Sequence, residues 1–216
     1  MISIRNISLF GGLFSIVVIA LGAWTRLVDA GLGCPDWPGC YGFVVFPTTE
    51  AEILIAEQRY PQFPYEIDKA IPEVVHRYFA AALGFVAILL VSFSFKHKLP
   101  ARIKAIASFL LFFICCQGLF GYLTVSLKLL PIIVTGHLFG GFITLSLFFY
   151  LFLNTTDGIK NHQIGHLKTL GGIALLALLI QIFLGAWTST NYASLACVDF
   201  PTCQGKFVPD MNFYDG

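Results

Sequence analysis

Two histidines, His76 and His137, stand inside long apolar segments of this 216-residue chain, where an ionisable side chain is rare and costly. His76 follows Glu73 by three residues, and His137 follows Pro131 by six. If both segments are helices, a rise of about 1.5 Å per residue brings the two imidazoles to similar depth. Neutral imidazoles on facing helices can supply both axial ligands of a haem iron. The pair predicts a haem site, although an intramembrane histidine can also be a hydrogen-bonding packing residue.

Charged residues accompany the first histidine in the sequence EVVHR. Glu73 and Arg77 share a helical face with His76, because residues three and four apart are neighbours on a helix. One interpretation is an ion pair at the helix entrance. The other makes Glu73 an acid/base or proton-relay group beside a haem edge, with Arg77 neutralising a carboxylate or propionate. Arg26, which ends the first apolar segment, could act similarly, and the sequence leaves these roles open.

Small residues continue the two histidine faces, at Ala80 and Gly84 on one segment and at Gly140 and Gly141 on the other. Small side chains would leave room for a flat macrocycle. They are also what close helix packing needs in a membrane. Both interpretations of these positions stay open.

Four cysteines form two closely spaced pairs, Cys34 with Cys40 in CPDWPGC and Cys197 with Cys203 in CVDFPTC. Proline and glycine in so short a loop reduce the chain entropy that closure must overcome, so we predict a disulfide within each loop. A redox-active or transient mixed disulfide is the alternative. Neither loop contains a histidine, which makes a zinc or copper site a poor interpretation.

The cysteine loops belong to a long internal repeat. The stretch GAWTRLVDAGLGCPDWPGCYG from Gly22 returns as GAWTSTNYASLACVDFPTCQG from Gly185, at a constant offset of 163 residues. We therefore expect a first repeat over 1–155 and the start of a second over 163–216. Equivalents of His76 and His137 would fall beyond residue 216, so we expect the second repeat to be incomplete in this chain.

Composition sets the class of protein that positions these residues. With 57% hydrophobic and 12% charged residues, the chain is too apolar for a soluble domain, and its net charge of +1 gives no reason to expect nucleic acid. Five segments are about 20 residues long, enough to cross a bilayer as helices: 7–27, 74–95, 103–127, 131–153 and 167–189. We predict an all-α integral membrane protein, a four-helix transmembrane bundle plus a fifth helix that opens a second, pseudo-symmetric repeat.

Basic residues predict the orientation. The loop KHKLPARIK joins the second and third segments, Lys160 and Lys168 lie between the fourth and fifth, and Arg5 precedes the first. Because such loops tend to stay in the cytoplasm, we expect a cytoplasmic N-terminus and both cysteine loops on the outer side. The first segment lacks a clear cleavage site and no transit peptide precedes it, which favours a bacterial plasma membrane.

Four stretches, in order along the chain, resemble the haem A synthases of the CtaA type, which act in cytochrome oxidase assembly: GAWTRLVDAGLGCPDWPGCYG, EVVHR, QGLFGYLTVSLKLLP and TGHLFGG. The resemblance implies an eight-helix protein of two four-helix halves, each with a pair of histidine ligands. It implies an oxidoreductase that converts haem O to haem A by oxidising a porphyrin methyl to a formyl group. A b-type haem would lie in the other half.

By the same likeness, this chain carries the substrate-haem half, with His76 and His137 as iron ligands and Glu73 as the catalytic carboxylate. Cys34 and Cys40 match the family's outer-loop pair. The implied partners are haem O, the lipid bilayer and an electron donor that the sequence does not identify. Haem O synthase and further copies of the chain in an oligomer are additional candidate partners. Two alternatives remain: a haem-binding electron-transfer or delivery module that would not need Glu73, and a non-catalytic oxidase assembly factor.

Overall fold

The computed structural model describes residues 3–155 and 165–207, and in these ranges it contains helices and no strands. The helices are α1 (Ile4–Leu27), α2 (Glu50–Arg59), α3 (Ile67–Lys96), α4 (Ala101–Ser126), α5 (Pro131–Asn154) and α6 (Gly165–Thr190), followed by a short 3-10 turn at Ala193–Leu195. All except α2 are long and apolar enough to cross a membrane. The prediction of an all-α, multi-pass membrane protein is confirmed.

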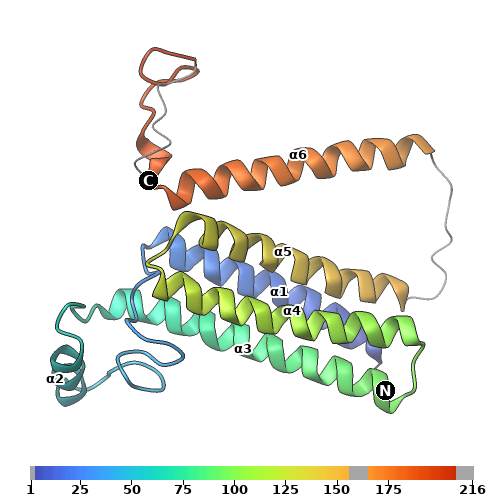
Figure 1. The fold of residues 1–216 in the computed structure, drawn as a ribbon, viewed down its shortest axis with the longest axis horizontal. Coiled ribbons are helices and arrows are strands. Elements are labelled where there is room, and N and C mark those ends of the chain that lie inside the picture. Colours follow the sequence, from blue (N-terminus) through green and yellow to red (C-terminus); the bar gives the residue numbers. More distant parts are fainter. Residues whose placement is uncertain (1–2, 156–164, 208–216) are drawn as a thin grey trace.

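Helices α1, α3, α4 and α5 form a four-helix bundle (Figure 1), in which α1 packs against α3 and α5 while α4 packs against the same two. Its core contains the fully buried side chains of Leu90, Leu110, Phe148 and Leu151. The Phe148 ring lies directly over Gly11, where a Cβ atom would collide with it. Glycine at that position therefore allows α1 and α5 to approach closely.

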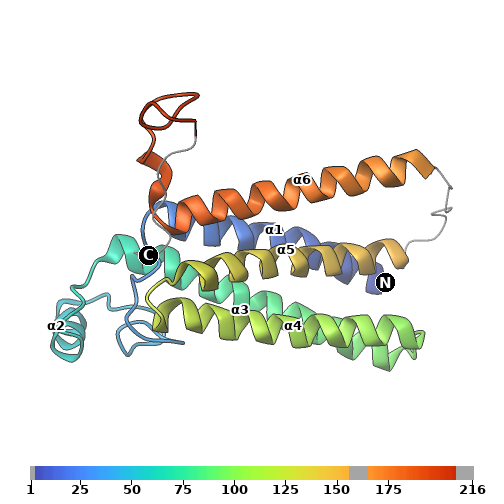
Figure 2. The same ribbon diagram turned by 45° about the horizontal axis from the view of Figure 1, so that its top comes forward.

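Helix α6 lies outside this bundle, along α5, with most of its apolar side chains exposed (Figures 1 and 2). The loops that carry the two cysteine pairs lie at the same end of the molecule, opposite to the start of α1 and the turn between α3 and α4 (Figure 1). This arrangement agrees with the predicted topology, in which successive membrane-spanning helices run in alternating directions and both cysteine loops lie at one end. Lys160 and parts of the segment 163–216 lie outside the described residues.

The largest departure from the predicted helix bounds concerns α3, which begins at Ile67, seven residues before the predicted start at 74. Asp68, Lys69 and Glu73 lower the hydropathy of its first turns, so an apolar window excludes them although the backbone is already helical. The predicted start of this helix is therefore wrong. His76 is nine residues into α3, whereas His137 is six residues into α5.

Helix α2 is absent from the sequence prediction, yet it carries a readable start signal. The Thr49 hydroxyl accepts the N–H of Glu52, and the Glu52 carboxylate accepts the N–H of Thr49, which is a capping box. Ala56 of α2 packs into a small second cluster with Tyr41 and the first disulfide. The connection between α1 and α3 is thus a folded cap over the end of the bundle where α1 ends and α3 begins.

Candidate functional site

The structure brings the two predicted ligands together between α3 and α5. The rings of His76 and His137 have centroids 6.5 Å apart and planes at 86°. Two metal–imidazole bonds of about 2 Å, plus about 1 Å from each bonded nitrogen to its ring centre, require a spacing of roughly 6 Å. The Nδ1 atoms of both rings are buried without a hydrogen bond, although the Val18 backbone lies near His76. Spacing and unpaired nitrogens fit a bis-histidine metal ligand set.

Two glycines that the sequence analysis did not single out lie against these rings. A Cβ atom on Gly22 of α1 would stand 3.0 Å from Cε1 of His76, and one on Gly121 of α4 would stand 3.8 Å from Cε1 of His137. Each glycine therefore lets a neighbouring helix border an imidazole. The sequence signal that could have identified Gly22 is the repeat, because Gly22 is the first residue of the repeated GAWT stretch.

The small residues that were expected to leave space for a macrocycle pack against neighbouring side chains instead. Ala80 packs against the bundle core. The added Cβ positions of three glycines meet side chains of neighbouring helices: Gly84 meets Ile114, Gly140 meets Gln117 and Gly141 meets Ile19. At these positions close helix packing, rather than room for a flat ligand, is what the structure describes.

Glu73, one turn before His76, forms an ion pair with Arg77, the residue after His76, and both hydrogen-bond to the first cysteine loop. Glu73 is 4% exposed, and its Oε2 accepts the N–H of Cys34 at 2.9 Å. Nη1 of Arg77 donates to the carbonyl oxygens of Asp36 at 2.9 Å and Gly39 at 2.5 Å, with Pro38 at 3.4 Å. The hydrogen bonds of the Arg77 guanidinium therefore go to the loop carbonyls and to Glu73.

Arg26 lies in the last turn of α1, and its guanidinium is directed to the end of α6. It donates to the carbonyl of Ser189 and stacks 4.0 Å from the centre of the Tyr192 ring. Asp29 completes the group, since its carboxylate lies 3.7 Å from Arg26 and accepts the Tyr192 hydroxyl at 3.0 Å. These four residues join the end of α1 to the end of α6.

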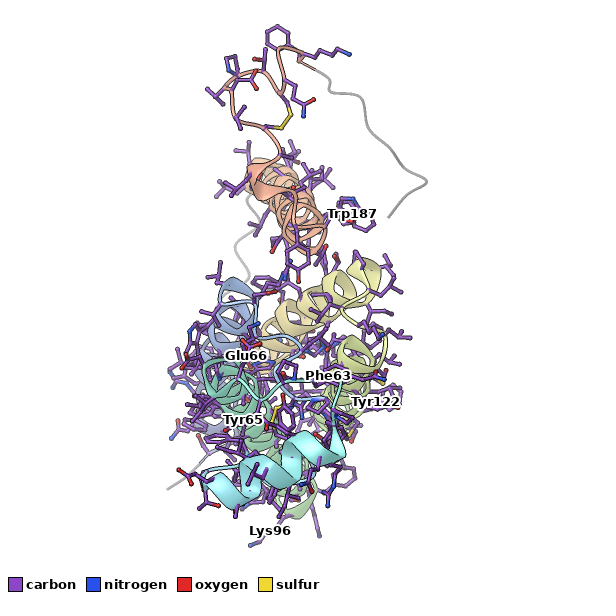
Figure 3. The ribbon with its side chains drawn as sticks, turned by 90° about the vertical axis from the view of Figure 1, so that its left-hand side faces the viewer. Phe63, Tyr65, Glu66, Lys96, Tyr122 and Trp187 are labelled. Carbon is purple, nitrogen blue, oxygen red and sulfur yellow. A yellow bond between two sulfur atoms is a disulfide. The ribbon has the colours of Figure 1, made fainter. Side chains whose placement is uncertain are left out.

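Both cysteine pairs are disulfides in the structure, and the two loops have the same internal geometry. The Asp36 carboxylate accepts the N–H groups of Tyr41 and Gly42, at 2.6 and 2.8 Å. The Asp199 carboxylate accepts those of Gln204 and Gly205, at 2.7 and 3.0 Å. The second loop stands away from the bundle, with its disulfide visible in yellow (Figure 3).

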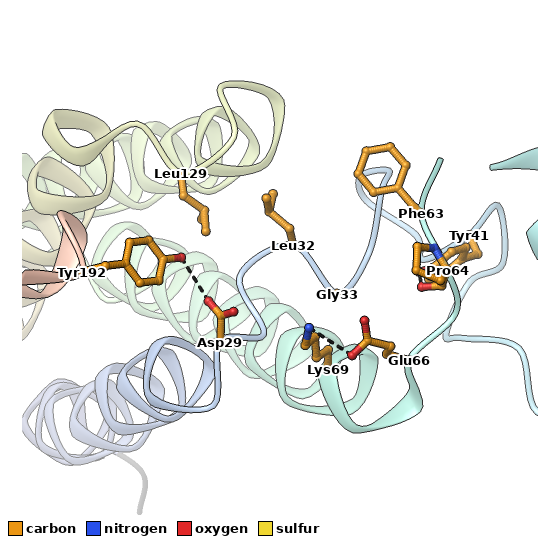
Figure 4. Close-up of a pocket in the computed structure, with 10 residues that line it drawn as sticks. All are labelled: Asp29, Leu32, Gly33, Tyr41, Phe63, Pro64, Glu66, Lys69, Leu129 and Tyr192. Atoms are coloured by element: carbon orange, nitrogen blue, oxygen red, sulfur yellow. Dashed lines mark hydrogen bonds and ion pairs between the residues drawn. The ribbon is translucent and has the colours of Figure 1, made fainter. Parts of the chain in front are cut away.

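A separate pocket of about 280 Å³ lies between the first cysteine loop and the adjacent helix ends (Figure 4). Its polar wall consists of two hydrogen-bonded pairs, Tyr192 with Asp29 and Lys69 with Glu66, the latter at 3.0 Å. Tyr41 also lines it; burial first, and then the charge of Glu66, raises the pKa of this phenol to about 12. Neither histidine lines this pocket, so it is distinct from the candidate ligand site.

Known proteins match the chain over nearly its whole length. A family model described as cytochrome oxidase assembly protein, COX15-CtaA, matches residues 5–215. The heme A synthase of Shewanella oneidensis is 40% identical over 205 residues, covering 94% of this chain and 62% of the relative. That of Halalkalibacterium halodurans is 30% identical over 222 residues, covering 96% and 67%.

The chain thus spans about two thirds of the length of these relatives. No solved structure matches it. The family match includes both cysteine loops and both membrane histidines, since all of them lie within residues 5–215. The chain belongs to the COX15-CtaA family of cytochrome oxidase assembly proteins.

Proposed function

We propose that this chain contributes the substrate-haem half of a haem A synthase, which oxidises a methyl group of haem O to a formyl group for cytochrome oxidase assembly. The observation that carries the proposal is the pair His76 and His137, at a ring spacing that fits two axial iron ligands. The relatives named heme A synthase support the reaction. Residues 1–155 would form the first repeat, and 163–216 would open the second, whose half would hold haem b.

The chain's own residues would divide the work as follows. His76 and His137 would ligate the haem iron, and the bound haem would supply the redox chemistry. Glu73, one helical turn before His76, has a carboxylate that could accept and return a proton at the haem edge. Arg77 and the Cys34 N–H orient that carboxylate through hydrogen bonds, so Glu73 would enter the reaction already positioned.

We further propose a bacterial plasma membrane location, with a cytoplasmic N-terminus and both disulfide loops outside. Lys96, Lys98, Arg102 and Lys104 support this orientation, because they lie at the end of the bundle that also holds the start of α1. An outer, oxidising compartment also suits two disulfides. Haem O synthase would be the source of the substrate. Conversion of a methyl to a formyl group removes four electrons, so the reaction needs an oxidant as well, and with dioxygen as that oxidant a separate electron donor would supply the reducing electrons.

The proposal can be tested in a host that makes haem O but lacks its own haem A synthase. We expect the purified chain to show a low-spin, bis-histidine absorption spectrum, and His76→Ala or His137→Ala to lose it. Glu73→Gln should keep that spectrum while haem A disappears from the extracted haems. Glu57→Gln, on the exposed face of α2, is the control. An unchanged spectrum in both histidine variants would overturn the haem site, and undiminished haem A in Glu73→Gln would remove Glu73 from the reaction.

One observation favours a second candidate, a haem-delivery or electron-transfer module. Glu73 already satisfies the Cys34 N–H and the Arg77 guanidinium, so its carboxylate has a structural task without any reaction. Under that function Glu73→Gln would leave haem transfer to oxidase intact provided that the fold survives. The histidine variants would still lose haem, so haem A content of the Glu73→Gln variant separates the two functions.

A further inference from the structure

An amide side chain lies unpaired among the apolar residues of α4. Gln117 is the first residue of the stretch QGLFGYLTVSLKLLP and lies more than two turns from either end of this helix, which is long and apolar enough to cross a membrane. Polar side chains at such a position are costly in a bilayer and usually form a hydrogen bond to a neighbouring helix. Within residues 3–155 and 165–207, no group forms a hydrogen bond with the Gln117 amide. The amide is therefore free to bind a polar group of a ligand.

The Gln117 amide lies over Gly140 of α5, in the same helix interface that borders one of the histidines. A Cβ atom on Gly140 would collide with this amide, and Gly140 itself is buried. Gly121, four residues after Gln117 and on the same face of α4, lies against the His137 ring. Because α4 and α5 run antiparallel (Figure 1), the contacts of residue 117 with 140 and of 121 with 137 lie one helical turn apart. Gln117 is therefore one turn from the level of His137.

The amide and the Glu73 carboxylate lie on opposite sides of the histidine pair. Helices α3 and α5 both begin at the end of the bundle that carries the first cysteine loop (Figure 1), and Glu73 lies one turn before His76 on that side. Gly140 follows His137 by three residues, so Gln117 is displaced toward the other end of the bundle. A ligand held between the two imidazoles would thus have an ion pair toward the loop end and a single neutral amide toward the apolar interior.

We propose that Gln117 determines substrate specificity by forming a hydrogen bond with the hydroxyl group of the hydroxyethylfarnesyl side chain of haem O. The inference rests on the proposed function, because it takes haem O as the ligand of His76 and His137. The two propionates would face the loop end, since carboxylates are costly in the bilayer interior. The hydroxyl belongs to the opposite half of the porphyrin and would therefore face Gln117. An amide can donate to a hydroxyl oxygen or accept its proton, so it can pair with either orientation of the hydroxyl.

Haem B is the natural comparison, because it carries an apolar vinyl group where haem O carries the hydroxylated side chain. A site that pairs with a hydroxyl rejects an analogue that lacks it, since the polar group of the site is then left unpaired. We would titrate the haem-free whole chain in detergent with haem O and with haem B, and follow the low-spin absorption spectrum. Gln117→Leu should lower the ratio of the two association constants, haem O over haem B, by about fivefold. The farnesyl chain also favours haem O, but it does so in every variant and cancels in this comparison.

Two further variants make the result specific. Gln117→Met keeps the unbranched shape and gives the same comparison if a leucine does not fit over Gly140, and Ser108→Leu on the exposed side of α4 should keep the wild-type ratio. An amide with only a structural task would alter the affinities for both haems alike. An unchanged ratio in the two Gln117 variants would therefore overturn the proposal and leave the proposed function standing. A wild-type chain that binds neither haem with a low-spin spectrum would overturn the haem site itself, and this inference with it.

Discussion

The Arg26 guanidinium donates a hydrogen bond to the carbonyl of Ser189, the residue that holds the same place in the second copy of the repeat. Asp29 and Tyr192 repeat this relationship, because they too are 163 residues apart and are joined by a hydrogen bond of 3.0 Å. Equivalent positions that contact one another are what a two-fold relationship produces at its axis. The C-terminal ends of α1 and α6 therefore meet through equivalent positions of the sequence repeat.

Arg26→Ala should loosen this junction. The variant loses a charge-assisted hydrogen bond, an ion pair and a cation–π contact, which together stabilise the junction by about 1–3 kcal/mol. We expect faster amide hydrogen exchange in residues 186–192, with the bundle core unchanged. Arg5→Ala, which removes the same charge from the other end of α1, should not alter exchange in that segment. Equal exchange in the Arg26→Ala and wild-type proteins would show that α5 alone holds α6.

Much of the bundle could be predicted from the sequence, because lipid-facing helices must be apolar over a fixed length. The bounds of α1, α4, α5 and α6 lie within three residues of the predicted segments. The start of α3 could not be found in this way, since its first turn carries Asp68 and Lys69 and is too polar for a hydropathy search. Helix α2 is too short and polar to be found by a hydropathy search. The capping box at Thr49 is the sequence signal that indicates its start.

The site was predictable as a set of residues but not as a set of contacts. Intramembrane burial marks His76 and His137, and helical spacing pairs Glu73 with Arg77. The contacts of Arg77 and Arg26 depend on how the loops fold back on the helix ends. A hydropathy pattern does not predict the conformation of a loop. The same limit applies to Gly22, whose contact with an imidazole depends on the distance between two helices.

The link between Arg77 and the first loop predicts unequal disulfide stability. Cys34 and Cys40 are fully buried, whereas Cys197 is exposed and Cys203 half-buried. A thiol reductant should therefore reduce Cys197–Cys203 first in the wild-type protein, since exchange requires access to a sulfur. Arg77→Gln should accelerate reduction of Cys34–Cys40 and leave the rate at Cys197–Cys203 unchanged, as followed by alkylation and mass spectrometry.

The same variant should also lower stability, because it leaves the Glu73 carboxylate buried without its cation. The expected loss is about 3 kcal/mol, and the double variant Glu73→Gln/Arg77→Gln should lose less than the two single variants combined. Thermal unfolding in detergent measures the difference. Additive losses would mean that the pair is not coupled, and an unchanged Cys34–Cys40 reduction rate would mean that Arg77 does not hold the loop.

Tyr41 predicts an alkaline loss of stability. Its pKa is raised from about 10 in an unfolded chain to about 12 by burial and by Glu66, while its hydroxyl donates to the Pro64 carbonyl at 2.9 Å. The folded protein therefore keeps a proton that the unfolded chain releases. The stabilisation is complete below pH 10 and disappears as the pH rises through 12.

Tyr41→Phe isolates this effect. At pH 7 the variant should be about 1 kcal/mol less stable, because the hydroxyl hydrogen bond to Pro64 is lost. Between pH 10 and 12 the difference between the two proteins should shrink, since only the wild type has a phenol to titrate. A difference in unfolding temperature that stays constant over this interval would show that Tyr41 does not titrate with a raised pKa.

Gly22 tests whether the imidazole geometry depends on a helix that carries neither ligand. In Gly22→Ala the new methyl group would lie 3.0 Å from Cε1 of His76, so the ring or α1 must shift by a few tenths of an ångström. The displaced His76 ring would bind the haem iron less favourably. We expect a loss of about 1.4 kcal/mol in binding free energy, which corresponds to tenfold weaker haem binding. Haem titration followed by the low-spin absorption spectrum measures this loss.

Gly12→Ala is the matched control on the same helix, because its new methyl group would have its nearest neighbour, Cβ of Phe148, at a comfortable 3.8 Å. It introduces the same helix-favouring substitution, so any general gain in α1 stability appears in both variants. Weaker haem binding in Gly22→Ala alone would assign the effect to the His76 contact. Equal haem affinity in both variants would mean that the ring moves freely in this pocket and that α1 does not set its orientation.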